Sequence, residues 1–169
     1  VLLSDRAFAN ADTLATSYVI VSAAKMLGDF DLIFCGKESL DGATGQMGAQ
    51  LAQRFEAAQV TGTLLIKEVN EEAKTAVVER ELEDGVETLE VQLPCLFTME
   101  KTNYPARIPN LKGKLAAKKA VITTITADDI PGLDRGRIGD PGSPTKVPRM
   151  FPPVMPEPGV IIDEGSVEA

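Results

Sequence analysis

A loop rich in glycine and in hydroxyl and amide side chains follows an apolar segment, and it has the residue types of an anion site. The loop reads "CGKESLDGATGQMG" and covers residues 35–48. Its glycines let the backbone approach a ligand closely, while Thr44 and Gln46 supply side-chain donors. A helix that starts in this loop would add free backbone N–H groups, which attract phosphate. The same pattern also fits an ordinary strand-to-helix connection, so the spacing alone leaves both interpretations open.

A second polar segment, "ADTLATS" at residues 11–17, places hydroxyl groups at the start of a predicted helix. Asp12 is positioned to cap this helix, and Thr13, Thr16 and Ser17 fall within its first turn and a half. Ordinary capping explains Asp12 without any ligand. If both helix starts face one crevice, however, their donors converge on a diphosphate, and the hypothesis is that they do.

The elements around these two segments predict an α/β domain. Residues 12–28 form an apolar helix, and "FDLIFCG" at 30–36 is typical of a parallel strand buried on both faces. Met47, Leu51 and Phe55 recur at i, i+4 and i+8, which indicates a second, amphipathic helix. The order strand, helix, strand, loop, helix is that of a doubly wound sheet, which binds ligands at the carboxyl ends of its strands.

The middle of the chain predicts an antiparallel extension of this sheet. Apolar and polar residues alternate over residues 88–93, and a turn at residues 83–85 joins this strand to a preceding one, which predicts a hairpin over 74–93. Further strands are predicted at residues 1–5, 59–70, 94–100 and 121–126.

The last part of the chain differs in composition. Most of the 11 prolines lie from Asp128 onward, so we expect residues 1–127 to form the nucleotide-binding domain and 128–169 an extended arm on a partner. Within the domain, a loop and short helix at 101–119 carry several lysines and Leu111, which is predicted to be an exposed apolar anchor.

Charge and residue counts exclude several classes of function. The 17 basic and 25 acidic residues give a formal net charge of −8, which disfavours nucleic-acid binding. No apolar run approaches the roughly 20 residues of a membrane helix. With no histidine, a Ser-His-Asp triad or a histidine-based metal site cannot form from these residues. Cys35 and Cys95 lie in apolar segments and are predicted to be buried free thiols of a cytoplasmic protein.

At this point the chain resembles a known family. The segments "DRAFANADTLATS", "DLIFCGKESLDGATGQMGAQLA", "VERELEDGVETLEVQLPCLFT", "NLKGKLAAKK" and "GSPTKV" are similar, in the same order, to the beta subunit of electron transfer flavoproteins. The resemblance implies a Rossmann-like adenine-nucleotide-binding domain, paired with an alpha subunit that the final arm reaches. The family has further N-terminal strands, and we expect those strands to be missing from this chain.

The resemblance also implies a cofactor site. In the family, the motif in residues 36–48 surrounds the phosphates of a nucleotide, which is AMP in one branch and FAD in the electron-bifurcating branch, where it receives hydride from NADH. The "DTLATS" segment resembles the bifurcating branch and favours FAD. The expected cofactor-binding residues are Asp12, Thr13, Thr16, Gly36, Lys37, Asp41, Gly42, Ala43, Thr44, Gln46, Met47 and Gly48.

The expected function is electron transfer by a bound flavin, with no acid–base catalysis by the chain itself. Leu111 and Lys112 resemble the recognition loop that docks on partner flavin dehydrogenases of the acyl-CoA dehydrogenase type. Two alternatives stay open here. The chain could be a non-bifurcating subunit with AMP in a structural role, or a stand-alone nucleotide-binding stress-type domain, which the proline-rich arm disfavours.

Overall fold

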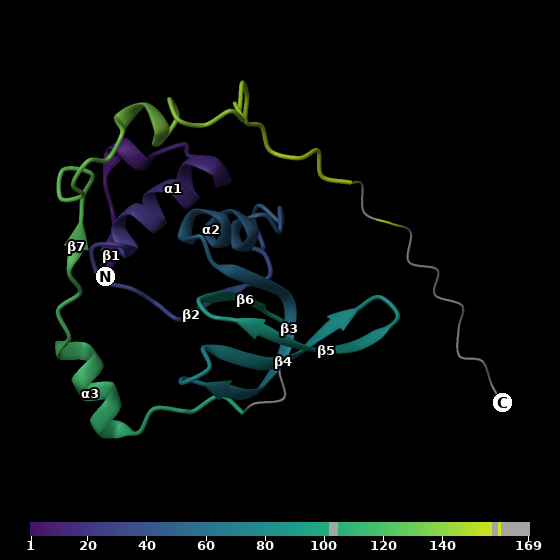
Figure 1. Cartoon of the computed structure of the whole chain (residues 1–169). Coiled ribbons are helices and arrows are strands. Elements are labelled where there is room, and N and C mark those ends of the chain that lie inside the picture. The colour runs from purple at the N-terminus through teal and green to yellow at the C-terminus, as the bar shows by residue number, and fades with distance from the viewer. Residues whose placement is uncertain (102–104, 157–158, 160–169) are drawn as a thin grey trace.

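The computed structural model describes residues 1–101, 105–156 and 159. A five-stranded mixed sheet carries two helices on one face, and a separate two-stranded sheet lies beside them (Figure 1). This arrangement confirms the predicted α/β class, with a parallel part and an antiparallel hairpin.

The five-stranded sheet has the order β2-β6-β3-β4-β5. β2 (Leu32–Gly36) and β3 (Ala58–Asn70) both pair in parallel with β6 (Cys95–Met99). β4 (Thr75–Leu82) pairs antiparallel with β3 and with β5 (Gly85–Gln92), which forms the predicted hairpin.

β6 lies between β2 and β3 and forms the centre of the core. Cys95, Leu96 and Phe97 are each 0% exposed. Cys95 and Phe97 pack into one cluster with residues of the hairpin strands, whereas Leu96 packs with both helices. The continuous apolar run at this position therefore marks a strand that is buried on both faces, as predicted.

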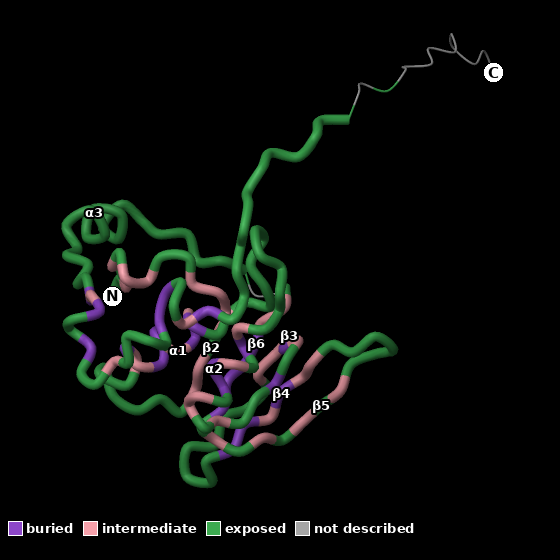
Figure 2. Tube along the Cα trace, turned by 90° about the horizontal axis from the view of Figure 1, so that it is seen from above, coloured by how far each residue is buried: buried purple, intermediate pink, exposed green. Residues whose placement is uncertain are grey.

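The helix α1 (Thr13–Ala24) is buried from two sides (Figure 2). Val21 packs with α2 (Met47–Phe55) and the sheet, while Val19 and Ala23 pack with residues from Ile125 to Ile138. A helix between two layers needs apolar residues around most of its surface, which explains its sequence.

β2 corrects one expectation. It was predicted to be buried on both faces, but it is the edge strand of the sheet, and Phe34 is 53% exposed. One edge of β2 has no neighbouring strand in the described part of the chain. Phe34 stacks on Phe97 with ring centroids 5.6 Å apart, so the Phe34 ring is packed on one side and exposed on the other.

The first and last predicted strands also differ from expectation. β1 (Leu2–Leu3) and β7 (Thr124–Ile125) pair in parallel with each other and do not join the main sheet. β7 is shorter than the predicted strand at 121–126, since Val121 and Ile122 are 94% and 67% exposed and pack against little.

Part of the expected arm belongs to the body of the protein. Ile130 and Ile138 are 4% and 2% exposed in the cluster on α1, with the 3-10 helix η2 (Arg135–Arg137) between them, and Ser143 is buried. These apolar contacts move the start of the extended segment from residue 128 to about Pro144. From there to Pro156 the chain runs outward with exposed side chains (Figures 1 and 2).

Two short features complete the fold. The 3-10 helix η1 (Arg6–Phe8) precedes α1, and α3 (Leu111–Lys119) lies between β6 and β7. Over the described ranges, every helix is too short or too polar to cross a bilayer.

Candidate functional site

The starts of α1 and α2 lie side by side. The Thr13 hydroxyl donates to Oε1 of Gln46 over 3.1 Å, and Nε2 of Gln50 donates to the same hydroxyl over 3.2 Å. The structure thus brings together the two polar segments, as the sequence predicted. Binding of a ligand between them stays a prediction.

The N-terminus of α2 has free backbone donors. Gln46 is its N-cap, but its side chain makes no capping hydrogen bond. Within the described residues, the N–H groups of Met47, Gly48 and Ala49 have no acceptor. Free N–H groups at a helix start carry a partial positive charge and attract anions. This end of α2 is therefore chemically suited to a phosphate.

The loop before α2 is exposed, and its conformation is set by a backbone hydrogen bond and by two residues with positive φ. The Ala43 N–H donates to the Ser39 carbonyl over 2.9 Å, and both Ala43 and Gly45 have positive φ, at 45° and 62°. The Asp41 carboxylate accepts from the Gly42 N–H over 2.9 Å. The Ser39 hydroxyl and the backbone N–H groups of Asp41 and Gly42 lower the pKa of Asp41. Asp41 therefore stabilises the conformation of the loop.

Asp12 turns toward the C-terminal segment instead of the loop. Oδ1 accepts from the Ala15 N–H over 3.0 Å and caps α1, while Oδ2 accepts from the Thr145 N–H over 3.0 Å. Partial burial acts to raise the pKa of Asp12, but these backbone donors outweigh it and lower the pKa. Asp12 thus takes up the Ala15 N–H, while α1 offers the site the Thr13 hydroxyl. Convergence of backbone amide groups from both helix starts stays a prediction.

Replacing Asp12 by alanine should lower the free energy of unfolding by about 2 kcal/mol, because a helix cap and one further hydrogen bond are lost together. Asp12→Asn keeps an oxygen for the cap but opposes an amide N–H₂ to the Thr145 N–H, so it should lose about half as much. Urea unfolding followed by circular dichroism measures both. An Asp12→Asn variant as stable as the wild type would show that the link to Thr145 contributes nothing.

Lys37 has a partner of its own. Its ammonium lies 2.7 Å from Oε1 of Glu100, and this hydrogen bond and charge raise the pKa of Lys37. The pair borders a pocket of about 300 Å³ that Gly45 and Thr98 also line. Lys37 would have to leave Glu100 in order to reach a phosphate above α2.

Gly48 packs against the sheet and does not face the loop opening. A Cβ at this position would lie 2.3 Å from Cγ2 of Thr98 and 3.4 Å from Sγ of Cys35. Gly48 therefore allows α2 to approach β6 closely. Of the other expected residues, Gly36 is exposed at the end of β2, and Thr16 is half-buried on α1.

Comparison with known proteins identifies the family. The chain matches the Electron transfer flavoprotein domain over residues 1–130. The chain belongs to the electron transfer flavoprotein domain family. The resemblance that the sequence motifs indicated is confirmed at this level.

Three relatives of the family show how far the likeness extends. The chain is 42% identical over 147 residues to electron transfer flavoprotein subunit beta of Thermoanaerobacterium thermosaccharolyticum, which covers 86% of this chain and 55% of that protein. It is 41% identical over 152 residues to Caffeyl-CoA reductase-Etf complex subunit CarD of Acetobacterium woodii, with 90% and 56% covered. It is 36% identical over 174 residues to Protein FixA of Bradyrhizobium diazoefficiens, with 100% and 60% covered. The chain spans 55–60% of the length of these electron transfer flavoprotein relatives.

The family motifs predicted the loop before α2 but not a row of polar residues along α2 itself. Gln46, Gln50 and Arg54 follow one another at i, i+4 and i+8 and all contact the first turns of α1. Oε1 of Gln50 is buried and has no hydrogen-bond partner among the described residues. The i, i+4, i+8 spacing of these polar residues, beside the apolar row of Met47, Leu51 and Phe55, is the sequence signal that indicates a second contact face of α2.

The two residues expected to dock on a partner lie away from this site, on α3 (Figure 1). α3 buries none of its residues, and Leu111 is 74% exposed. Leu111 is therefore not a core residue, and its docking role, with that of Lys112, stays a prediction. Residues 102–104 of the predicted loop at 101–119 lie outside the described residues.

The cysteines are free thiols and offer no nucleophile. Cys95 is buried and Cys35 is half-buried, so the expectation of two buried thiols holds for Cys95 only. Burial raises the pKa of both thiols, that of Cys95 to about 11. Thiols with a raised pKa stay protonated at neutral pH and react slowly.

Proposed function

We propose that this chain is part of an electron transfer flavoprotein beta subunit and that its α2 loop holds the phosphates of an adenine nucleotide. One observation carries the proposal. The uncapped start of α2 follows the loop whose motif the family uses for this purpose, and it lies against the Thr13 hydroxyl. Backbone donors at a helix start bind phosphate without a cationic side chain, which agrees with Lys37 being paired elsewhere.

The favoured nucleotide is FAD, with AMP as the alternative. Binding of either nucleotide between the two helix starts is supported by Oε1 of Gln50 beside Thr13, which has no partner among the described residues, because a buried acceptor without a donor is costly until a ligand or water supplies one. A bound flavin would accept hydride from NADH and release electrons singly. The protein's part is to bind the nucleotide, orient it and surround it with hydrogen bonds.

The name of the CarD relative, a Caffeyl-CoA reductase-Etf complex subunit, favours a role within a larger electron-transferring complex. We propose an alpha subunit of the family as the partner of the extended segment from Pro144, and a flavin dehydrogenase as the partner of exposed Leu111 on α3. Electron bifurcation is the proposed mode when the nucleotide is FAD.

The identity of the nucleotide tests the proposal directly. The chain is expressed together with an alpha subunit of the family, and the complex is separated by gel filtration, denatured and analysed for released nucleotide by absorption and mass spectrometry. Two flavins per complex would support FAD in this subunit, and one flavin with one AMP would support the structural role. Absence of any nucleotide beyond the alpha-subunit flavin would contradict both.

Thr44→Ala combined with Gln46→Ala should reduce the nucleotide retained after gel filtration at least about tenfold, because two donors beside the phosphates are removed. Asn70→Ala is the control and should leave nucleotide content unchanged, because Asn70 ends β3 and its side chain bonds to the Ala73 N–H of the following turn. Equal content in the Thr44/Gln46 variant and the control would remove these residues from the site.

A further inference from the structure

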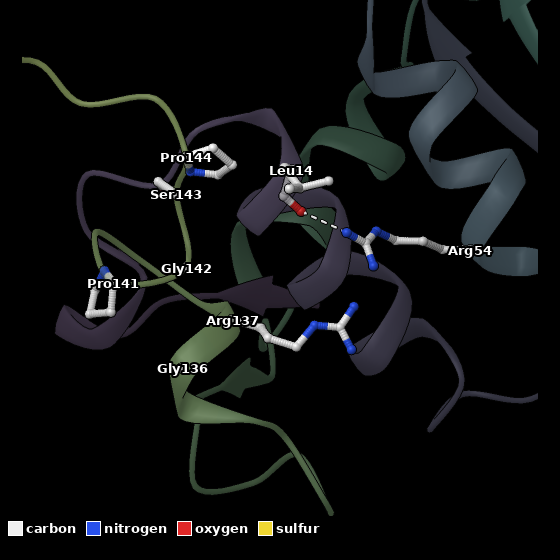
Figure 3. A pocket seen from close by; sticks show the side chains of 8 residues that line it. All are labelled: Leu14, Arg54, Gly136, Arg137, Pro141, Gly142, Ser143 and Pro144. Carbon is white, nitrogen blue, oxygen red and sulfur yellow. Dashed lines mark hydrogen bonds between the residues drawn. The ribbon is translucent and has the colours of Figure 1, made fainter.

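Two arginines from distant parts of the chain point toward the same pocket (Figure 3). Arg54 lies on α2 and Arg137 on η2, and their guanidinium carbons lie 5.5 Å and 4.1 Å from the centroid of the Tyr18 ring. The Tyr18 hydroxyl accepts a hydrogen bond from the Asp134 N–H over 3.1 Å, which fixes the ring against η2. The tyrosine thus holds two positive charges close together.

Neither guanidinium forms a salt bridge within the described part of the chain. In the segment around η2, Asp128 pairs with Arg135 and Asp140 with Lys146, and the Asp134 carboxylate accepts from the Gly136 N–H. In a chain with 25 acidic and 17 basic residues, two adjacent arginines without a carboxylate are a local reversal of charge.

The Arg54 side chain is fixed in place but keeps donors for a ligand. Nε donates to Oγ of Ser17 over 3.0 Å, and Nη2 donates to the Leu14 carbonyl over 3.1 Å. Both acceptors are neutral, and the N–H groups on Nη1 have no acceptor among the residues that the structure describes. Burial and the charge of Arg137 lower the pKa of Arg54, so the free protein carries a repulsion that an anion would relieve.

The pocket between the two arginines has room for more than a single ion. Its volume is about 430 Å³, and its walls are mostly apolar or backbone. It lies by the last turn of α2, about 13 Å along the helix from the loop at its start. The lining residues are Leu14, Arg54, Gly136, Arg137, Pro141, Gly142, Ser143 and Pro144.

We propose that Arg54 and Arg137 form a second anion site, which binds the diphosphate group of a small molecule. Two guanidinium groups offer planar pairs of donors that match phosphate oxygens, and a ligand with at least two negative charges balances both. The site uses none of the side chains assigned to the nucleotide loop, so it does not depend on the proposed function.

Titration of the chain with inorganic pyrophosphate by calorimetry, at low ionic strength, tests the site. The wild type should bind saturably in the millimolar range or tighter, and Arg54→Gln with Arg137→Gln should bind at least about tenfold more weakly. Lys114→Gln with Lys118→Gln on exposed α3 removes the same charge and should stay within about twofold of the wild type. Because the start of α2 also attracts phosphate, the arginine replacement is repeated in the Thr44→Ala, Gln46→Ala background, where the same loss of about tenfold should be seen.

Tyr18 supplies a local signal. The chain has two tyrosines and no tryptophan, so a Tyr104→Phe background leaves Tyr18 as the single tyrosine. Pyrophosphate should change its fluorescence with the same midpoint as the heat signal, since Arg137 moves relative to the ring. Arg137 is exposed, so Arg137→Gln alone, which leaves the fold intact, should abolish most of this change.

Three results would overturn the proposal. The first is equal affinity of the wild type and the arginine variant. The second is an equal loss in the lysine control, which would mean attraction by overall charge. The third is a folded wild type that binds no pyrophosphate. That result would favour a carboxylate of a protein partner as the group that the two arginines bind.

Discussion

Phe97→Ala should lower the free energy of unfolding by about 4 kcal/mol, the largest loss expected for a single replacement in this chain. Phe97 is 0% exposed on the central strand β6 and stacks on Phe34, with ring centroids 5.6 Å apart. Truncation removes the ring from a cluster that contains residues of β3, β4 and β5. The lost burial and the remaining cavity both act in the same direction.

Urea unfolding of the chain measures this loss, with Phe97→Leu as the matched control. Leucine keeps most of the apolar volume and should cost only about 1 kcal/mol. A loss below about 1 kcal/mol for the alanine variant would mean that β6 is not central to the core.

Gly48→Ala should lower the free energy of unfolding by about 2 kcal/mol, although alanine favours helix formation more than glycine does. The added methyl group would lie 2.3 Å from Cγ2 of Thr98, so α2 must move away from β6. Because the phosphate loop leads into α2, nucleotide retention should fall in the same variant.

A second replacement can relieve this clash. Thr98→Ser removes the methyl group in contact but keeps the oxygen that accepts from the Gly62 N–H over 3.1 Å. The double variant Gly48→Ala, Thr98→Ser should therefore be more stable than the sum of the two single losses predicts. Strictly additive losses would contradict a direct contact between these residues.

Local patterns predicted the elements with a clear period or a clear turn. The apolar row of α2, the continuous run of β6 and the turn before Gly85 each specify one kind of structure from neighbouring residues alone. The start of α2 after β2 could also be predicted, since a parallel strand leads directly through the loop into this helix. The place of α1 could not, because β1 before it does not join the main sheet.

The remaining features depend on contacts between residues far apart in the chain. β1 and β7 contribute two residues each, which is too short for a pattern. Ile130 and Ile138 stand in a segment rich in Gly and Pro, so nothing local indicates that they cover α1. The pairing of Lys37 with Glu100 and the lack of space around Gly48 likewise require the packed structure.

The chain between β6 and β7 is anchored at both ends. The Glu100 N–H donates to the Thr63 carbonyl over 2.9 Å, and the Leu2 N–H donates to the Thr123 carbonyl over 2.9 Å. α3, between these anchors, adds nothing to the interior. Substitutions in α3 should therefore cost little folding free energy, so its sequence can diverge while the rest of the domain keeps its structure. Grafting the corresponding helix of a relative onto this chain should accordingly leave the fold unchanged.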